Sequence, residues 1–287
     1  MKKIIASAVI SAALSVSASA YFDGGITGTT GPHGYSGTKL DLVIGSGNFA
    51  LQPSLATYKS DVAGTAAGKT FRTYELRGAM EADKYTVAAF AGTTPEVADY
   101  SNKFAGGDIT FSLTPGSGSH SRLAGPGSRS GARGGQGITR VDVGVGLKHT
   151  LHTQVMPVTD RETSQTEASM FGGAKIMMVN LAASYTAYSY GDEDATPRGF
   201  VPGLSFAQLA KPKSSVNVKL DIPGYPMVTP YVSYTGTKYK GGADNSSAYL
   251  FGAYIDLSMV MANVGYQIFD NGNTKDNFIT FGAGIKF

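Results

Sequence analysis

Apolar and polar residues alternate along most of this chain of 287 residues. In the clearest internal stretch, residues 139–149, valine or leucine occupies positions 141, 143, 145 and 147, and charged residues or glycine lie between them. Successive side chains of a β-strand point to opposite faces, so this period of two predicts strands. Fourteen segments are predicted as strands, the first being Gly- and Thr-rich and weaker than the rest: 21–30, 38–45, 49–58, 69–80, 84–92, 108–113, 139–149, 166–177, 178–190, 214–222, 227–239, 248–257, 260–269 and 277–287.

The connections between these segments alternate in length. Short connections are predicted at 45–48, 81–83, 177–178, 223–226 and 257–259, and longer ones at 60–68, 93–105, 153–165, 191–212, 241–246 and 270–276. Bacterial outer-membrane barrels place short turns at the periplasmic end and longer loops outside, with an even number of strands. We therefore expect an all-β, antiparallel up-and-down barrel of about 14 strands, or 12 if the weak strands fail.

One segment does not fit this alternation. Residues 115–137 consist mostly of Gly, Ser and Pro with Arg122, Arg129 and Arg133, and are expected to be flexible because they offer no core. In the predicted register they form a long connection at the short-turn end.

The last eleven residues, NFITFGAGIKF, place Ile279, Phe281, Ala283, Ile285 and Phe287 on one face. This segment resembles the C-terminal strand of outer-membrane β-barrels, which is apolar at every second position and ends in Phe. The resemblance covers eleven residues and implies that this strand closes the barrel against the first one. It also implies lipid and the barrel-assembly machinery as partners, with Phe281, Ile285 and Phe287 as the assembly signal.

The first twenty residues have the pattern of a secretory signal peptide. Lys2 and Lys3 precede an apolar stretch from Ile4 to Val16, and Ser17 to Ala20 offer a small-residue cleavage site, so cleavage is predicted after Ala20. We expect residues 21–287 to form a single barrel domain in the outer membrane. Aromatic residues near predicted strand ends are expected to form interfacial girdles: Tyr58, Tyr74, Tyr85, Tyr188, Tyr190, Tyr239, Tyr249 and Phe269.

Composition and motifs argue against other classes of protein. The net charge of +3 does not suggest nucleic-acid binding, and the absence of cysteine excludes disulfides and thiolate metal sites. None of the four histidines, His33, His120, His149 and His152, has an aspartate within two residues, and His149 and His152 should point to opposite faces. The acidic run 192–194 is interpreted as solvated loop charge, so neither an enzyme nor a metal or cofactor site is expected.

The polar faces of the strands carry charges of both signs. The residues expected to line the lumen are Lys39, Asp41, Glu75, Arg77, Asp108, Arg140, Asp142, Lys148, Lys219 and Asp221. Charges in a dry core are costly, whereas a hydrated lumen accommodates them. A 14-stranded barrel lies between sizes that side chains fill and sizes that leave an aqueous channel.

These observations favour a passive diffusion channel for small hydrophilic solutes, with weak ion selectivity because both signs are interspersed. Two alternatives remain open. In the first, ion pairs fill a closed lumen, and a structural or adhesion barrel acts through loops 93–105, 153–165 and 191–212. In the second, the barrel is an outer-membrane hydrolase. The oligomeric state is not indicated by the sequence.

Deletion of Phe287 is expected to reduce the amount of folded barrel in the outer membrane, because it removes the end of the assembly signal. The heat-modifiable gel mobility of membrane fractions measures this, with Lys286→Ala on the opposite face as the matched control. Normal insertion of the truncated chain would contradict our interpretation of the C-terminus.

Overall fold

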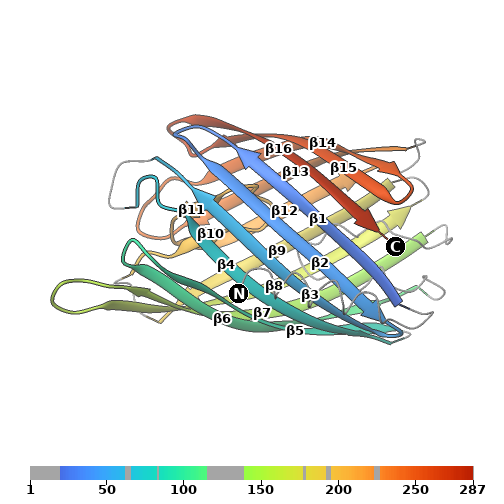
Figure 1. Ribbon diagram of the computed structural model, residues 1–287, viewed down its shortest axis with the longest axis horizontal. Coiled ribbons are helices and arrows are strands. Elements are labelled where there is room, and N and C mark those ends of the chain that lie inside the picture. The colour runs from blue at the N-terminus through green and yellow to red at the C-terminus, as the bar shows by residue number, and fades with distance from the viewer. Residues whose placement is uncertain are drawn as a thin grey trace, which may run out of the picture.

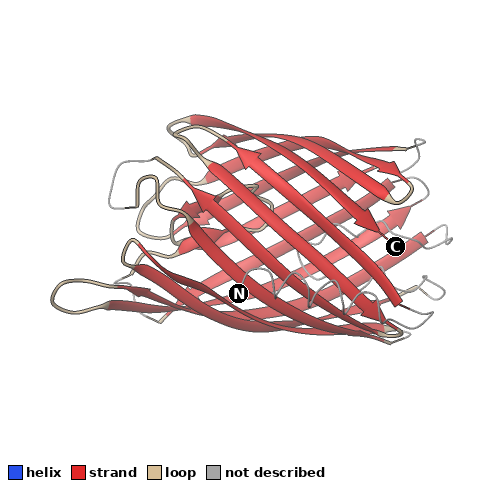
Figure 2. Ribbon diagram, viewed as in Figure 1, coloured by secondary structure: helices blue, strands red, loops and turns tan. Residues whose placement is uncertain are grey.

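The computed structural model describes residues 20–61, 66–82, 84–114, 139–176, 179–191, 195–222 and 227–286. Within these ranges fourteen antiparallel strands close into a barrel (Figures 1 and 2). The barrel strands are β1 (Ala20–Thr30), β2 (Ser36–Ser46), β3 (Phe49–Lys59), β4 (Phe71–Glu81), β5 (Tyr85–Val97), β6 (Tyr100–Ser112), β7 (Thr139–Gln154), β8 (Arg161–Ile176), β9 (Val179–Tyr190), β12 (Pro212–Asp221), β13 (Val228–Tyr239), β14 (Ser246–Leu257), β15 (Val260–Asp270) and β16 (Lys275–Lys286). The expected 14-stranded fold is confirmed, and the 12-stranded alternative is wrong.

The barrel closes where β16 pairs with β1. This antiparallel register runs from Asp23 opposite Lys286 to Thr30 opposite Ile279. Every other barrel strand pairs with its neighbour along the chain, except that β9 pairs with β12 across an inserted two-stranded sheet. That sheet consists of β10 (Arg198–Phe200) and β11 (Ala207–Leu209). Among the described residues no helix is long and apolar enough to cross a membrane, and this absence has no bearing on crossing by strands.

The two faces of the barrel wall have opposite character. Large apolar side chains on the outer face are exposed, such as Leu76 at 51%, Met170 at 66% and Phe281 at 59%. Polar side chains on the inner face are buried, and Gln267 and Thr186 are 0% and 1% exposed. A soluble sheet protein would bury the apolar face instead. This arrangement therefore suits a barrel whose outer face contacts lipid and whose interior is polar.

The strand ends define two ends of the barrel. We call the end where β1 begins and β16 stops the terminus end, and the opposite one the loop end. The connections β2–β3, β4–β5, β8–β9, β12–β13 and β14–β15 are at the terminus end, as the alternation of short and long connections predicts. The predicted signal peptide (except Ala20), residues 115–137 and Phe287 lie outside the described residues.

Two predicted loops are largely strand. Residues 93–105 form the ends of β5 and β6, which are joined by a tight turn in which Ala98 and Asp99 have φ of 51° and 61°. Residues 153–165 are mostly the ends of β7 and β8, leaving only 155–160 as loop. The β7–β8 hairpin projects beyond the rest of the barrel (Figure 1). The extensions of β5 and β8 are mostly polar, whereas on β6 Tyr100 and Phe104 face inward, so these extensions lack the outward apolar alternation that identifies the other strands.

Replacing Leu76, midway along β4 on the outer face, with Arg is expected to destabilise the barrel in lipid by about 2–4 kcal/mol. Ser54→Arg is the matched control, because Ser54 faces the interior on the neighbouring strand and water can solvate the new charge. Urea unfolding in phospholipid vesicles measures both. Equal costs for the two variants would contradict the assignment of faces.

Candidate functional site: a charged lumen narrowed by an inward-folded loop

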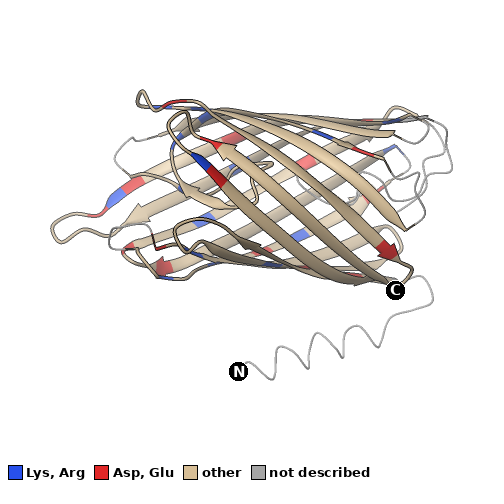
Figure 3. Ribbon diagram, turned by 90° about the horizontal axis from the view of Figure 1, so that it is seen from above, with Lys and Arg blue, Asp and Glu red and all other residues tan. Residues whose placement is uncertain are grey.

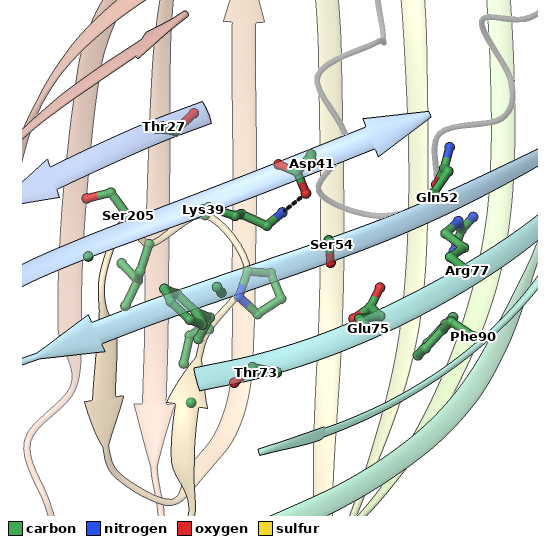
Figure 4. Close-up of a pocket in the computed structure, with 18 of the residues that line it drawn as sticks. Thr27, Lys39, Asp41, Gln52, Ser54, Thr73, Glu75, Arg77, Phe90 and Ser205 are labelled. Atoms are coloured by element: carbon green, nitrogen blue, oxygen red, sulfur yellow. Dashed lines mark ion pairs between the residues drawn. The ribbon is translucent and has the colours of Figure 1, made fainter. Parts of the chain in front are cut away.

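A cavity of about 1220 Å³ lies inside the barrel. Side chains of β2, β3 and β4 project into it, together with part of the segment between β9 and β12 (Figure 4). Six of the ten sequence-predicted lumen residues line this cavity: Lys39, Asp41, Glu75, Arg77, Asp108 and Lys148.

The other four predicted residues are placed differently. Lys219 and Asp221 are on the inner face of β12 but do not line the cavity. The Lys219 ammonium lies 4.9 Å from the Tyr254 ring centroid and donates to the Tyr254 hydroxyl at 3.0 Å. Asp142 is partly buried on β7, on the opposite face from the exposed Val143, and it does not line the cavity. The side chain of Arg140 lies outside the described residues.

Most of the lumen charges are paired. Arg77 reaches across β5 and donates two hydrogen bonds to Asp108, at 2.5 and 3.0 Å, with its guanidinium 5.9 Å from the Phe90 ring centroid. Lys148 pairs with Glu167 on β8 at 3.2 Å, and Lys39 pairs with Asp41 at 3.0 Å. Basic and acidic positions are accordingly interspersed along the strands (Figure 3).

Two features of these pairs were not evident in the sequence. Arg77 stands two positions from Glu75, yet it pairs with Asp108 because that carboxylate faces the same lumen two strands away. Glu167 was not predicted as a lumen residue, because β8 has little apolar alternation to show which of its residues point inward.

Residues 195–211, which we call the plug loop, fold into the loop end of the barrel. Val201, Leu204 and Phe206 of this loop are buried. Phe206 stacks on Phe278 of β16, with ring centroids 4.0 Å apart and planes at 3°. The plug loop and barrel wall together form an apolar cluster: Tyr35, Tyr58, Phe71, Tyr100, Val201, Leu204, Phe206, Ala248, Phe269 and Phe278.

The aromatic residues that were predicted to form interfacial girdles divide between the two faces of the barrel wall. Of these residues, Tyr58, Tyr188 and Phe269 are buried on the inner face, while Tyr74, Tyr85 and Tyr249 are exposed on the outer face. The reason is strand parity. Tyr58, for example, shares a face with the lumen-lining Ser54 and Ala56.

A fully buried glutamine anchors the plug loop. The side-chain oxygen of Gln267 accepts hydrogen bonds from the backbone N–H and the hydroxyl of Ser205, at 2.9 and 2.6 Å, and its amide nitrogen donates to the Gly203 carbonyl at 3.0 Å. Gly203 has φ of 84°, and a Cβ there would approach Thr235 Oγ1 to 2.1 Å, so glycine permits this close packing. A local sequence motif does not predict this contact, because Ser205 and Gln267 are 62 positions apart.

Tyrosine hydroxyls add two more anchors. The hydroxyl of Tyr35 accepts a hydrogen bond from the backbone N–H of Ala207, and that of Tyr100 accepts one from Arg198, both at 3.0 Å. The Arg198 guanidinium lies over the Phe71 ring, 4.6 Å from its centroid. The plug loop is therefore held on several sides of the barrel wall.

The two histidines of β7 point to opposite faces, as predicted. His149 is exposed, whereas His152 is buried. His152 Nδ1 lies 2.7 Å from the Tyr100 hydroxyl, and its Nε2 lies 2.9 Å from Gln165 Oε1. His152 is therefore held between a phenol and an amide with no carboxylate from the described part of the chain to orient it, and on the outer face His149 Nδ1 lies 3.0 Å from the Thr166 hydroxyl. Among the described residues no group of three His, Asp or Glu side chains could hold a metal ion.

Comparison with known proteins identifies the fold. No family model matches the chain, and no curated protein sequence matches it. Among solved structures, the CymD monoaromatic hydrocarbon channel is similar with a TM-score of 0.53 and 10% identity, over 93% of this chain and 88% of that one. CdiB from Acinetobacter baumannii is similar with a TM-score of 0.51 and 9% identity over 94% of this chain, which spans only 60% of CdiB.

A NanC porin structure has a TM-score of 0.47 and 12% identity, over 93% of this chain and all of that one. At these identities the likeness is one of fold. The closed 14-stranded barrel and its similarity to CymD and CdiB confirm the resemblance in fold to outer-membrane β-barrel proteins, and no specific family is identified.

Replacing Gln267 with Ala is expected to loosen the plug loop, because three hydrogen bonds between the loop and β15 are lost. Hydrogen exchange of the Ser205 amide should accelerate at least about tenfold, corresponding to about 1.4 kcal/mol of lost protection. Ser169→Ala is the matched control, because Ser169 lines the lumen and its hydroxyl bonds only Thr186 on the next strand. Unchanged exchange in the Gln267 variant would show that other contacts hold the loop.

Proposed function

We propose that this protein lies in the outer membrane and acts as a passive diffusion channel for small hydrophilic solutes. The observation that carries the proposal is the cavity of about 1220 Å³ inside the barrel, where charged and hydroxyl side chains of β2–β8 face the interior beside apolar and aromatic residues of the wall and the plug loop. In this placement the terminus end faces the periplasm and the loop end faces outside, following the usual arrangement of bacterial barrels.

The exposure of the lumen charges supports a hydrated interior. The Lys39 and Asp41 side chains are 53% and 33% exposed although they face the inside of the barrel. Ionised groups of this kind keep water around them, because complete desolvation is costly. Arg77 and Asp108, at 10% and 2%, are instead desolvated and form a fixed part of the wall.

The plug loop supports a limit on solute size. Its apolar residues pack against β3, β4, β15 and β16 at the loop end, which narrows the barrel there. Its hydrogen bonds to β6, β15 and the β1–β2 connection keep it in place. Small solutes would therefore pass beside a fixed obstruction rather than through an open cylinder.

The similarity to CymD supports transport across the barrel as a use of this fold, but not the same solute. CymD is described as a monoaromatic hydrocarbon channel. Apolar residues such as Phe90 and Phe104 also line the cavity here, but ion pairs from β2, β4, β6, β7 and β8 stand beside them, and a hydrocarbon passing these charges would have to displace the water that solvates them. We therefore retain hydrophilic solutes as the transported class.

A structural or adhesion role is the second candidate. The projecting β7–β8 hairpin favours it, because its loop exposes Val158 at 95% and Met156 at 37%. Of the three loops that the sequence assigned to this role, 153–165 is reduced to the hairpin tip 155–160, and 93–105 is strand apart from a tight turn. Most of the third, 191–212, folds into the barrel as the plug loop. A hydrolase is not proposed, since no carboxylate among the described residues contacts His152, and the other histidine of β7, His149, meets the Thr166 hydroxyl on the outer face and away from the cavity.

Insertion of the purified protein into a planar lipid bilayer tests the channel. We expect discrete conductance steps in KCl, and swelling of protein-containing liposomes in small sugars that slows as the sugar grows. Larger steps with Gln267→Ala would support passage beside the plug loop. Correctly folded protein that shows no opening at any voltage would contradict the proposal and favour the adhesion candidate.

A further inference from the structure

The charges around the cavity do not cancel completely. Every basic residue that the barrel strands contribute to its lining has an acidic partner: Lys39 with Asp41, Arg77 with Asp108 and Lys148 with Glu167. Asp23, nearer the terminus end, also has interactions of its own. Glu75 on β4 is the remaining carboxylate of the described cavity lining, and it forms no hydrogen bond or ion pair.

The position of Glu75 explains why it stays unpaired. It faces Ser54 of β3 on one side and Gly92 of β5 on the other, and neither residue carries a charge. Arg77, two positions along β4, is turned toward Asp108 by a two-pronged hydrogen bond, and this geometry is the strongest available to a guanidinium. Lys39 is engaged with Asp41, and Figure 4 shows no ion pair that involves Glu75.

Among the described lining residues, Arg198 of the plug loop is the other charge without an ion pair, and it does not pair with Glu75. Its guanidinium lies over Phe71, which is four residues from Glu75 on the same strand. At about 3.3 Å per residue, Phe71 and Glu75 are roughly 13 Å apart along β4, so Arg198 is held nearer the loop end of the barrel than Glu75.

We propose that Glu75 makes the channel selective for small cations, both inorganic ions and small ammonium compounds. This inference rests on the proposed channel function and deepens it, and it departs from the weak selectivity expected from the sequence, because most charges of opposite sign are paired with each other and Glu75 is not. Glu75 is midway along β4, at the middle of the barrel wall, and its carboxylate is partly exposed to the cavity. A cation passing this point is attracted by a fixed negative charge, and an anion is repelled. The paired groups contribute little, because each presents both signs together.

The reversal potential across a bilayer in a KCl gradient tests the assignment. We expect the wild-type channel to prefer K⁺ over Cl⁻ about fivefold, because one charge about 8 Å from the ion in water attracts K⁺ and repels Cl⁻ by about 0.5 kcal/mol each, a difference of about 1 kcal/mol. In Glu75→Gln, which keeps the shape and removes the charge, the permeability ratio should fall to about 1. Glu75→Asp should retain the preference, and Ser54→Ala, a neutral lumen neighbour, should leave it unchanged.

A second variant makes the test independent of folding differences between proteins. The chain has no cysteine, so Glu75→Cys provides a single thiol. A negatively charged methanethiosulfonate added to the open channel should restore the K⁺ preference, and a positively charged one should produce a Cl⁻ preference in the same molecules.

A permeability ratio that is the same in wild type and Glu75→Gln, and that neither reagent changes, would overturn the role of Glu75 while leaving the channel proposal intact. Absence of conductance in the folded wild-type protein would overturn the channel proposal, and the selectivity with it.

Discussion

Closure of the sheet between β1 and β16 is the constraint on which the rest of the structure depends. In lipid, an unpaired backbone N–H or C=O has no water to bond, so a spanning sheet must have no free edge. The register from Asp23–Lys286 to Thr30–Ile279 removes the last two edges. Once the sheet is closed, each strand has one face toward the outside and one toward the enclosed space. The alternation of apolar and polar residues in the sequence then determines which side chains face outward and which face the enclosed space.

That alternation gives the interior its chemistry. Charged residues such as Arg77 and Asp108 are tolerated inside because they pair across strands and receive hydrogen bonds. The plug loop fills part of the same space by a different means, with an aromatic cluster and a buried glutamine. The lumen therefore combines a charged wall on β2–β8 with an apolar obstruction at the loop end, and the proposed size limit and ion preference follow from these two parts.

A structural feature could be predicted from the sequence where apolar and polar residues alternate locally, and could not be predicted where they do not. β7 and β16 alternate so clearly that their faces, and the even number of strands, were predictable. The outer ends of β5 and β8 were missed, because above the apolar belt both faces are polar. Nothing local marks residues 195–211 as inward-folding, since Phe206 contacts Phe278 and Ser205 contacts Gln267 across the barrel. Likewise, Glu75, Arg77 and Asp108 were predicted to line the lumen from their positions on the strands. That Asp108 is the partner of Arg77 could not be predicted, because it depends on which strands lie close together in space.

The central claim, an apolar outer face and a wet, charged inner face, is tested most directly by single-cysteine labelling along β7. The chain contains no cysteine, so each engineered thiol reports one position. In barrels reconstituted in lipid vesicles, we predict that cysteines at 146 and 148 react with a water-soluble reagent. Cysteines at 143 and 145 should react only with a lipid-soluble one. Equal labelling at all four positions, or the reverse alternation, would contradict the account.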